Sequence, residues 1–242
     1  MFKVLLPFIS SIWFLASWWW FFYYQRGVGI IAIVSAILII LTGRFIAKSQ
    51  WWSLKGMWLN FLWCYFGQFL FLLLLKTEHW RYILAFVFSA LWSAVWFLVI
   101  RYSRNVLLWQ SKDYLVFRRF WYYFNFWLLS SSAYALVIFV GLPMYYSAAV
   151  LLLVVLLSGY DLSTGPWHTR WLNMLLLFFI MLQLVLVIYF LPVNFYVAGA
   201  LLSLWFFFIS DSIVEAGPHF LGSLTLFMLA NIVLLATSLF NL

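Results

Sequence analysis

The sequence contains few charged residues and almost no cysteine. Only 7% of its 242 residues are charged and five of them are acidic, whereas an average soluble domain has about 25% charged residues. The single cysteine, Cys64, excludes a disulfide framework, a CxxC pair and a thiolate metal cluster within the chain. A Gly-rich phosphate loop, an HExxH motif and a GxSxG motif are also missing. The sequence therefore encodes no recognisable nucleotide-driven step and no standard hydrolase site.

Hydrophobic residues make up 69% of the chain and aromatic residues 24%. A soluble globule of this length would expose much of that apolar surface to water, so we predict that lipid surrounds most of the chain. A helix needs about 20 apolar residues to cross the hydrocarbon core, which leaves room for about eight or nine spans. The predicted fold is an all-α, polytopic integral membrane helix bundle, with residues 1–242 forming a single transmembrane domain.

Hydropathy and breaker residues indicate nine spans. We interpret the first as uncleaved, because no small-residue cleavage site precedes its aromatic end. The sixth and eighth spans are short and each opens after a Leu-Pro step, so a re-entrant path remains open for these two. The expected spans are residues 4–24, 27–46, 57–75, 82–100, 120–141, 143–159, 171–190, 193–210 and 219–240.

The thirteen lysines and arginines serve first as topology signals. If all nine spans cross, ten of these cations lie on one side of the membrane and three, Arg26, Lys76 and Arg81, on the other. By the positive-inside rule the amino terminus is cytoplasmic. The net charge of +8 is thus assigned to topology, and no nucleic-acid partner is predicted.

Two short motifs recur along the chain at one common offset. Trp58-Leu59-Asn60 returns as Trp171-Leu172-Asn173, and Leu91-Trp92 returns as Leu204-Trp205, both 113 residues later. The same shift superimposes the first four spans on the next four, which predicts a tandem repeat of four-helix halves. Chance matches in a chain rich in leucine and tryptophan are the alternative. The predicted parts are residues 1–113, residues 114–226 and a final span at 219–240.

Residues 101–119 mix cations with apolar side chains. An amphipathic basic segment of this kind binds the anionic inner leaflet, at about 1 kcal/mol per cation near the surface. The alternative is that the fourth and fifth spans extend past the membrane with snorkelling arginines. The candidate membrane-surface cations are Arg101, Arg104, Lys112, Arg118 and Arg119.

The centres of the spans contain amides and hydroxyls but no Asp, Glu, Lys, Arg or His. This pattern disfavours a proton- or sodium-coupled transporter. Gln68 and Gln183 lie near the middles of the third and seventh spans, which the repeat treats as counterparts, and Asn231 lies in the last span. These residues are candidate polar contacts of a cavity or substrate. Interhelical hydrogen bonds, worth about 0.6–2 kcal/mol each, are the alternative.

The segment from Asp211 to His219 has the composition of a metal site. Asp211 and Glu215 share one face if the segment is helical, and His219 follows after a Gly-Pro turn. A second loop with Asp161 and His168 lies on the same predicted side, and the two loops together would polarise a lipid phosphate. Helix capping and turn formation are the alternative for both loops. No cofactor is predicted.

Two predicted outer turns resemble those of known sequences. The turns at Leu142-Pro143-Met144-Tyr145-Tyr146 and Leu191-Pro192-Val193-Asn194-Phe195-Tyr196-Val197-Ala198 are similar to turns of uncharacterised polytopic membrane proteins of candidate-phyla bacteria. The resemblance covers only part of the chain and rests on apolar residues. It implies a small multi-pass protein of the bacterial inner membrane, and it carries no activity and no functional residue.

Three classes of function follow from these observations. We favour a non-enzymatic membrane component, a scaffold, assembly factor or complex subunit whose partners are the lipid bilayer and other membrane proteins. The second class is a carrier or channel for a small uncharged or lipidic substrate, with Gln68 and Gln183 as contacts. The third is a metal-dependent lipid-modifying enzyme. Its residues would be Asp211, Glu215, His219, Asp161 and His168. An enzyme is therefore the less expected interpretation.

Overall fold

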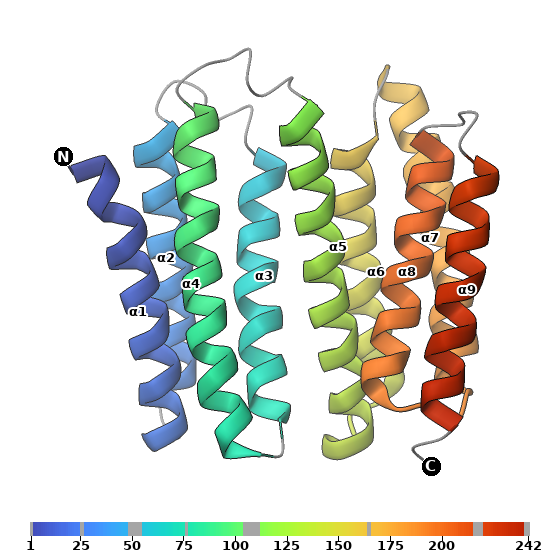
Figure 1. The fold of residues 1–242 in the computed structure, drawn as a ribbon, viewed down its shortest axis with the longest axis horizontal. Coiled ribbons are helices and arrows are strands. Elements are labelled where there is room, and N and C mark those ends of the chain that lie inside the picture. Colours follow the sequence, from blue (N-terminus) through green and yellow to red (C-terminus); the bar gives the residue numbers. More distant parts are fainter. Residues whose placement is uncertain are drawn as a thin grey trace. The chain divides into compact units, whose positions relative to one another are not determined.

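The computed structural model describes residues 2–24, 27–47, 55–75, 77–103, 112–163, 166–214 and 220–239. Throughout these ranges the regular elements are helices, and no strand occurs among them (Figure 1). The all-α prediction is thus confirmed for the described chain. The helices are α1 (Phe2–Tyr24), α2 (Val28–Ala47), α3 (Lys55–Leu74), α4 (Glu78–Ser103), α5 (Lys112–Ala135), the π-helical turn η3 (Leu136–Val140), α6 (Met144–Leu162), α7 (Trp167–Tyr189), α8 (Phe195–Val214) and α9 (Phe220–Leu239).

Five segments are long and apolar enough to cross a membrane, counting only described residues. Helices suit this environment because each one satisfies its backbone hydrogen bonds internally, without water. Shorter apolar helical stretches lie in α2, α3 and α9. The predicted count of eight or nine spans therefore stays a prediction. The five candidate spans are Glu78–Arg101, Val116–Val140, Met144–Leu162, Trp167–Tyr189 and Phe195–Ile213.

The predicted sixth and eighth spans are continuous helices. Pro143 occupies the N-cap position of α6, where its missing N–H costs nothing. Asn194 caps α8, because its side-chain Oδ1 accepts a hydrogen bond from the Tyr196 N–H at 3.0 Å. Both helices belong to the five candidate spans. Each of the two segments is thus long and apolar enough to cross a membrane, and the choice between a full span and a re-entrant path stays open.

Helices α4 and α5 extend past the predicted spans at 82–100 and 120–141. Helix α4 continues to Ser103, and α5 begins at Lys112. The predicted spans stop where charged and polar residues lower the hydropathy. A helix can continue through such residues outside the hydrocarbon core. At the other end of α5, the π-helical turn leads into Gly141, whose φ of 71° lies in the left-handed region that glycine adopts most easily.

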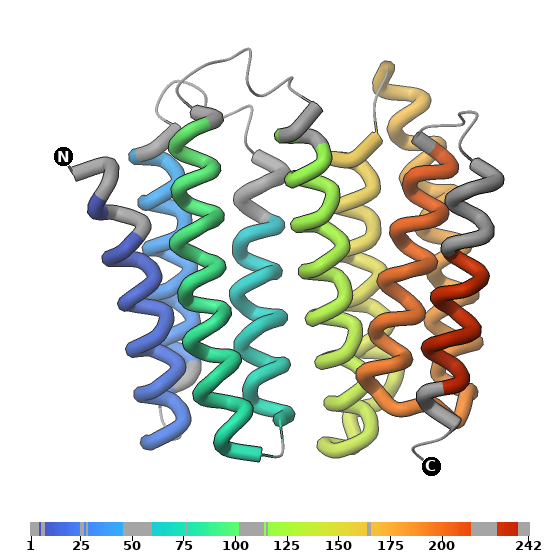
Figure 2. Tube along the Cα trace, viewed as in Figure 1, coloured from blue at the N-terminus to red at the C-terminus, as the bar shows by residue number. Residues whose placement is uncertain are grey.

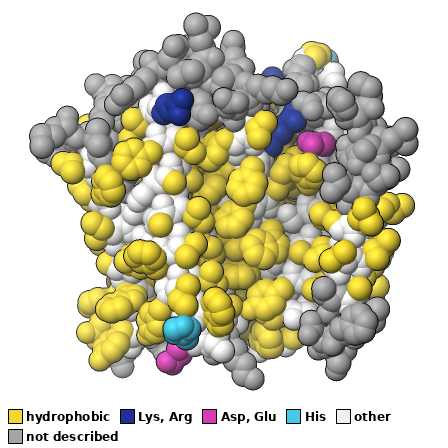
Figure 3. Space-filling model, in the orientation of Figure 1, with side chains coloured by type: hydrophobic (Ala, Val, Ile, Leu, Met, Phe, Trp, Pro, Cys, Tyr) yellow, Lys and Arg dark blue, Asp and Glu magenta, His cyan; other side chains and the backbone are white. Residues whose placement is uncertain are grey.

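The chain forms two compact units, Met1–Arg118 and Arg119–Leu242, which we call unit 1 and unit 2. Their boundary falls inside α5, close to the predicted boundary between residues 113 and 114. Figure 2 shows the helices of each unit as consecutive up-and-down passes. On the face seen in Figure 3, hydrophobic side chains fill the middle of each unit, and the coloured charged side chains lie towards the helix ends.

Unit 1 is built around the contact between α1 and α4, and α2 packs against α1, α3 and α4. Large aromatic side chains fill its core. The Phe14 ring lies 5.0 Å from the Tyr65 ring and 4.8 Å from the Trp92 ring, between centroids. Trp18, Trp92 and Trp96 are fully buried. Aromatic pairs of this kind add stability beyond the area they bury.

Unit 2 contains a chain of helix contacts in which α6 packs on α7, α7 on α8, and α8 on α9. Helix α5 joins this group through α8. The Ser130 Oγ donates a hydrogen bond to the Gly199 carbonyl at 3.1 Å, and Phe126 packs against Phe206 with 4.7 Å between ring centroids. A small residue at position 199 allows this close approach, as is typical of helix pairs in membranes.

Candidate functional sites: polar networks and an apolar groove

A continuous chain of hydrogen bonds links α1, α2 and α3 in the core of unit 1. The Trp13 Nε1–H donates to Ser35 Oγ at 3.1 Å, and the Ser35 hydroxyl donates to Tyr65 OH at 2.9 Å. The Ser17 hydroxyl donates to the Phe14 carbonyl at 2.8 Å, so Tyr65 must be the donor in its 3.2 Å contact with Ser17. Each hydroxyl proton therefore takes part in one hydrogen bond, and no donor in this hydrogen-bond chain is left without an acceptor.

Gln68 lies fully buried in the same core. Its Oε1 accepts a hydrogen bond from the Trp92 Nε1–H at 2.8 Å, and its Nε2 donates to Cys64 Sγ at 3.2 Å. The amide thus joins α3 to α4 and gives a buried indole N–H its acceptor. For Gln68, the structure matches the interhelical alternative stated above rather than a contact with an open cavity.

The other two candidate amides have different surroundings. Asn231 is half-buried, and its Nδ2 donates to the Phe227 carbonyl of its own helix at 2.8 Å. Gln183 is exposed on α7. The predicted correspondence of Gln68 and Gln183 therefore joins a buried residue of unit 1 to a surface residue of unit 2.

Serine-to-carbonyl hydrogen bonds join the first and fourth helices of two groups, α1–α4 and α5–α8. In unit 1 the Ser89 hydroxyl of α4 donates to the Ser11 carbonyl of α1 at 2.7 Å. In unit 2 the Ser203 hydroxyl of α8 donates to the Tyr123 carbonyl of α5 at 2.9 Å. The two bonds span 78 and 80 residues of sequence.

Two consecutive tyrosines of α5 bind the two carboxylates of the predicted metal loops. The Tyr122 hydroxyl donates to Asp161 Oδ2 on α6, and the Tyr123 hydroxyl donates to Asp211 Oδ1 on α8 at 3.1 Å. Adjacent residues on a helix point about 100° apart, so one helix reaches both neighbours. Arg119 lies beside Asp211, with 3.8 Å between its Nη1 and Oδ1.

The proposed metal ligands are only partly described. Asp211 is half-buried and already holds Tyr123 and Arg119, and His168 is exposed. Glu215 and His219 lie outside the described residues. Among the residues that are described, no group of three His, Cys, Asp or Glu side chains lies close enough to hold a metal ion. The contacts of Asp161 and Asp211 are those of residues that connect helix ends.

The predicted basic segment is divided between two helices. Arg101 is exposed in the last turn of α4, and Lys112 is the first residue of α5. Arg118 and Arg119 are half-buried in α5. Arg104 lies outside the described residues. The described cations thus lie on helical extensions, in agreement with the second of the two interpretations given for this segment.

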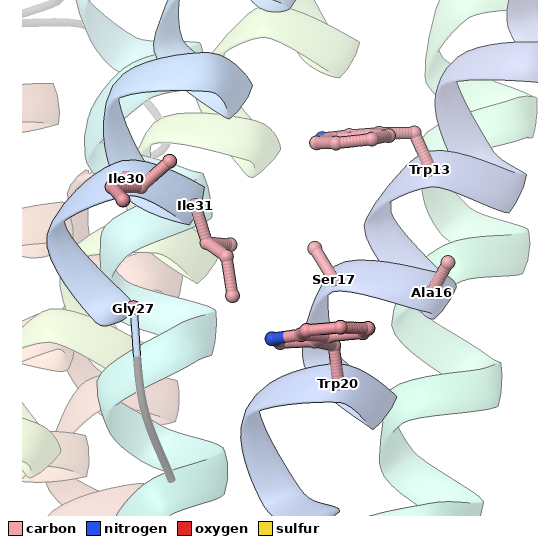
Figure 4. A pocket seen from close by; sticks show the side chains of 7 residues that line it. All are labelled: Trp13, Ala16, Ser17, Trp20, Gly27, Ile30 and Ile31. Atoms are coloured by element: carbon pink, nitrogen blue, oxygen red, sulfur yellow. The ribbon is translucent and has the colours of Figure 1, made fainter. Parts of the chain in front are cut away.

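An apolar groove of about 450 Å³ lies between α1 and α2. Trp13 and Trp20 project from α1 two helical turns apart, with Ser17 between them, and Ile30 and Ile31 face them from α2 (Figure 4). A second groove of about 590 Å³ shares Ala16 and Trp20 with the first and continues past the tyrosines at the end of α1. Volumes of this size are typical of sites for small apolar ligands.

Two structural features could not be predicted from the sequence. The hydroxyls of Ser17, Ser35 and Tyr65 were visible in apolar spans, but their separations of 30 and 48 residues gave no sign that they meet. Arg81, for which the sequence indicated only a topological role, donates from Nε to the Leu75 carbonyl at 2.6 Å. It thereby caps the carboxyl end of α3 from the first turn of α4, because a basic side chain can donate to the last carbonyls of a helix.

No protein-family model, curated protein or solved structure gave a significant match to this chain.

Proposed function

We propose that this chain is a multi-pass membrane protein that acts as a non-enzymatic scaffold, assembly factor or complex subunit. The observation that carries the proposal is the use of the buried polar groups. Gln68, the Ser17–Ser35–Tyr65 chain and Ser203 all bond to neighbouring helices. Their hydrogen-bonding capacity holds helices together, so these groups are not offered to a substrate.

The outer surface supports the same proposal. Large apolar side chains are exposed on each of the five candidate spans, for example Phe86, Phe139 and Phe179. Exposure of such faces to water is unfavourable, so lipid or the helices of other membrane proteins would cover them. We infer that the partners of the chain are the bilayer and other membrane proteins.

We also propose nine membrane passes in the bacterial inner membrane, with a cytoplasmic amino terminus. The support is the ten-to-three distribution of cations across the predicted sides. The described carboxylates of unit 2 agree with an interfacial position at one end of the helices, where Asp211 pairs with Arg119. The resemblance of the two outer turns to bacterial membrane proteins supports the choice of membrane.

A tandem repeat of α1–α4 and α5–α8 is part of the proposal. The matching bonds of Ser89 to the Ser11 carbonyl and of Ser203 to the Tyr123 carbonyl support it. In both cases the fourth helix of the group donates to the first, at sequence positions related by close to the 113-residue offset of the tryptophan motifs. An even number of helices per repeat would keep both halves in the same orientation.

Gentle extraction into lipid nanodiscs, followed by mass spectrometry of the retained proteins and lipids, tests the proposed function. We expect the chain to be retained with another membrane protein in a fixed ratio. A variant that carries Gly199→Val, which the packing of α5 on α8 should not tolerate, serves as the unfolded control. Recovery of the folded chain without any protein partner would contradict the scaffold proposal.

The second candidate function is that of a carrier for a lipidic molecule, and the α1–α2 groove favours it. If an acyl chain occupies this groove, Ala16→Phe should fill the space and release lipid that copurifies with the chain. Ala90→Phe, at an exposed alanine of α4 outside the groove, is the matched control. Equal lipid content in the two variants and the unaltered chain would remove the groove from consideration as a lipid site.

A further inference from the structure

Helix α7 has two different faces. Its buried face consists of Met174, Leu177, Met181, Val185 and Ile188, which pack within unit 2. With 3.6 residues per turn, Gln183 lies at the centre of the opposite face, and its side chain is exposed. Leu176 and Phe179 below it and Leu186 above it are exposed as well.

Gln183 is unusual among the polar residues of the candidate spans. Away from the helix ends, the other serine, threonine, asparagine and glutamine side chains described in the five spans are buried or half-buried. Gln183 lies six residues before Tyr189, or about 9 Å from the end of α7 at 1.5 Å per residue. A glutamine side chain is too short to reach the interface from there. In lipid its carboxamide would have no hydrogen-bonding partner, which is costly.

The exposed residues around Gln183 follow a heptad pattern. Steps of four and three residues alternate along one seam of α7, as in the a and d positions of a coiled coil. The seam consists of Leu172, Leu176, Phe179, Gln183, Leu186 and Phe190. The apolar members alone would suit lipid equally well, so the amide at the centre of the seam decides the interpretation. A single polar residue at an a position is a known determinant of register and oligomeric state.

We propose that a second copy of this chain packs on this seam and that the two Gln183 carboxamides pair across the interface. This inference rests on the proposed function, because it takes α7 to cross the bilayer. Copies inserted with one topology are related by a two-fold axis along the membrane normal, which places identical residues at the same depth. A carboxamide is self-complementary, because each one donates an N–H to the other and accepts one in return. The two-fold axis also makes the paired helices parallel, and a heptad seam is compatible with that orientation.

Cysteine cross-linking of the full chain in its native membranes tests the pairing. In a Cys64→Ser background, we expect Gln183→Cys to form an oxidised dimer of twice the 28.7 kDa mass of the chain. Leu153→Cys, an exposed mid-helix position of α6 in the same unit, is the matched control and should remain monomeric. Equal dimer yields at the two positions, no dimer from Gln183→Cys, or a cross-link to a different polypeptide would overturn the proposal.

Dimerisation in liposomes, measured by energy transfer between labelled copies, tests the role of the amide. Gln183→Leu should weaken the dimer about three- to tenfold, in line with one or two lost interhelical hydrogen bonds. Gln183→Asn keeps a carboxamide and should weaken the dimer less than Gln183→Leu does. An unchanged dimer in Gln183→Leu would overturn the amide pairing. If Gln183→Leu stays folded, fails to dimerise and still captures a different membrane protein, the scaffold proposal stands on its own. If the unaltered chain dimerises but captures no other protein, the scaffold proposal fails and the pairing of Gln183 stands on its own.

Discussion

Unit 1 and unit 2 hold apolar helices together by different means. Unit 1 has buried bonds that join side chain to side chain, as between Tyr65 and Ser35 and between Gln68 and Trp92, in addition to the bond from Ser89 to the Ser11 carbonyl. In the middle of unit 2 the bonds between helices join a hydroxyl to a backbone carbonyl, as from Ser130 to Gly199 and from Tyr134 to Val185. The side-chain bonds from Tyr122 and Tyr123 to the two aspartates lie at one end of the helices. A carbonyl acceptor is present at every residue, so unit 2 depends on close approach of the backbones. Unit 1 depends on the chemical identity of each partner.

The largest effect should come from Gly199 in unit 2. A Cβ at this position would lie 2.6 Å from the Ser131 Cα, so even alanine forces α5 and α8 apart. We expect Gly199→Ala to lower the free energy of unfolding by at least the 1–3 kcal/mol typical of overpacking. Denaturant titration in mild detergent measures the change. Gly29→Ala meets no atom within 4 Å and should leave the stability unchanged or raise it. Equal stabilities of the two variants would show that backbone proximity does not control unit 2.

The corresponding change in unit 1 is Gln68→Leu. It removes the acceptor of the Trp92 indole and leaves a buried N–H without its partner. The expected loss is about 1–3 kcal/mol of unfolding free energy. Gln183→Leu provides the comparison, because the exposed amide should contribute less than about 0.5 kcal/mol to the stability of the monomer. A neutral Gln68→Leu variant would mean that core packing alone holds α3 to α4.

Two tyrosines allow a direct test of the comparison between units. Tyr65→Phe interrupts a chain in which the hydroxyl both accepts and donates, so we expect a loss of about 1–2 kcal/mol. Tyr134→Phe removes one bond to the Val185 carbonyl, for which the expected loss is about 0.6 kcal/mol. Thermal unfolding of both variants under one set of conditions ranks them. The reverse order would contradict the claim that identity matters more in unit 1.

A small effect is expected for the ion pair of unit 2. Arg119 and Asp211 are 3.8 Å apart, and their side chains are 25% and 35% exposed. Asp211→Asn should therefore change the free energy of unfolding by less than about 1 kcal/mol. Measurement at low and high salt separates the charge effect, because salt screens exposed pairs. A much larger loss would indicate that the Tyr123–Asp211 bond, rather than the ion pair, controls this end of unit 2.

The sequence predicted the helices more accurately than the contacts between them. Each predicted span overlaps one observed helix, because long apolar runs leave few alternatives to an α-helix. The ends of α4 and α5 were missed, since charge ends a hydropathy signal without ending a helix. The face that each residue occupies was not predictable, because residues that face lipid and residues that face the core are equally apolar. The burial of Gln68 and the exposure of Gln183 therefore required the structure.

The hydrogen-bond chain of unit 1 also bears on the electrical insulation of a membrane. It starts at the Trp13 indole, which only donates, and ends at the Phe14 carbonyl, which only accepts. A proton wire needs a group at each end that exchanges protons with its surroundings. This hydrogen-bond chain has no such group at either end. The hydroxyls of Ser17, Ser35 and Tyr65 can therefore hold three helices together without conducting protons across a membrane.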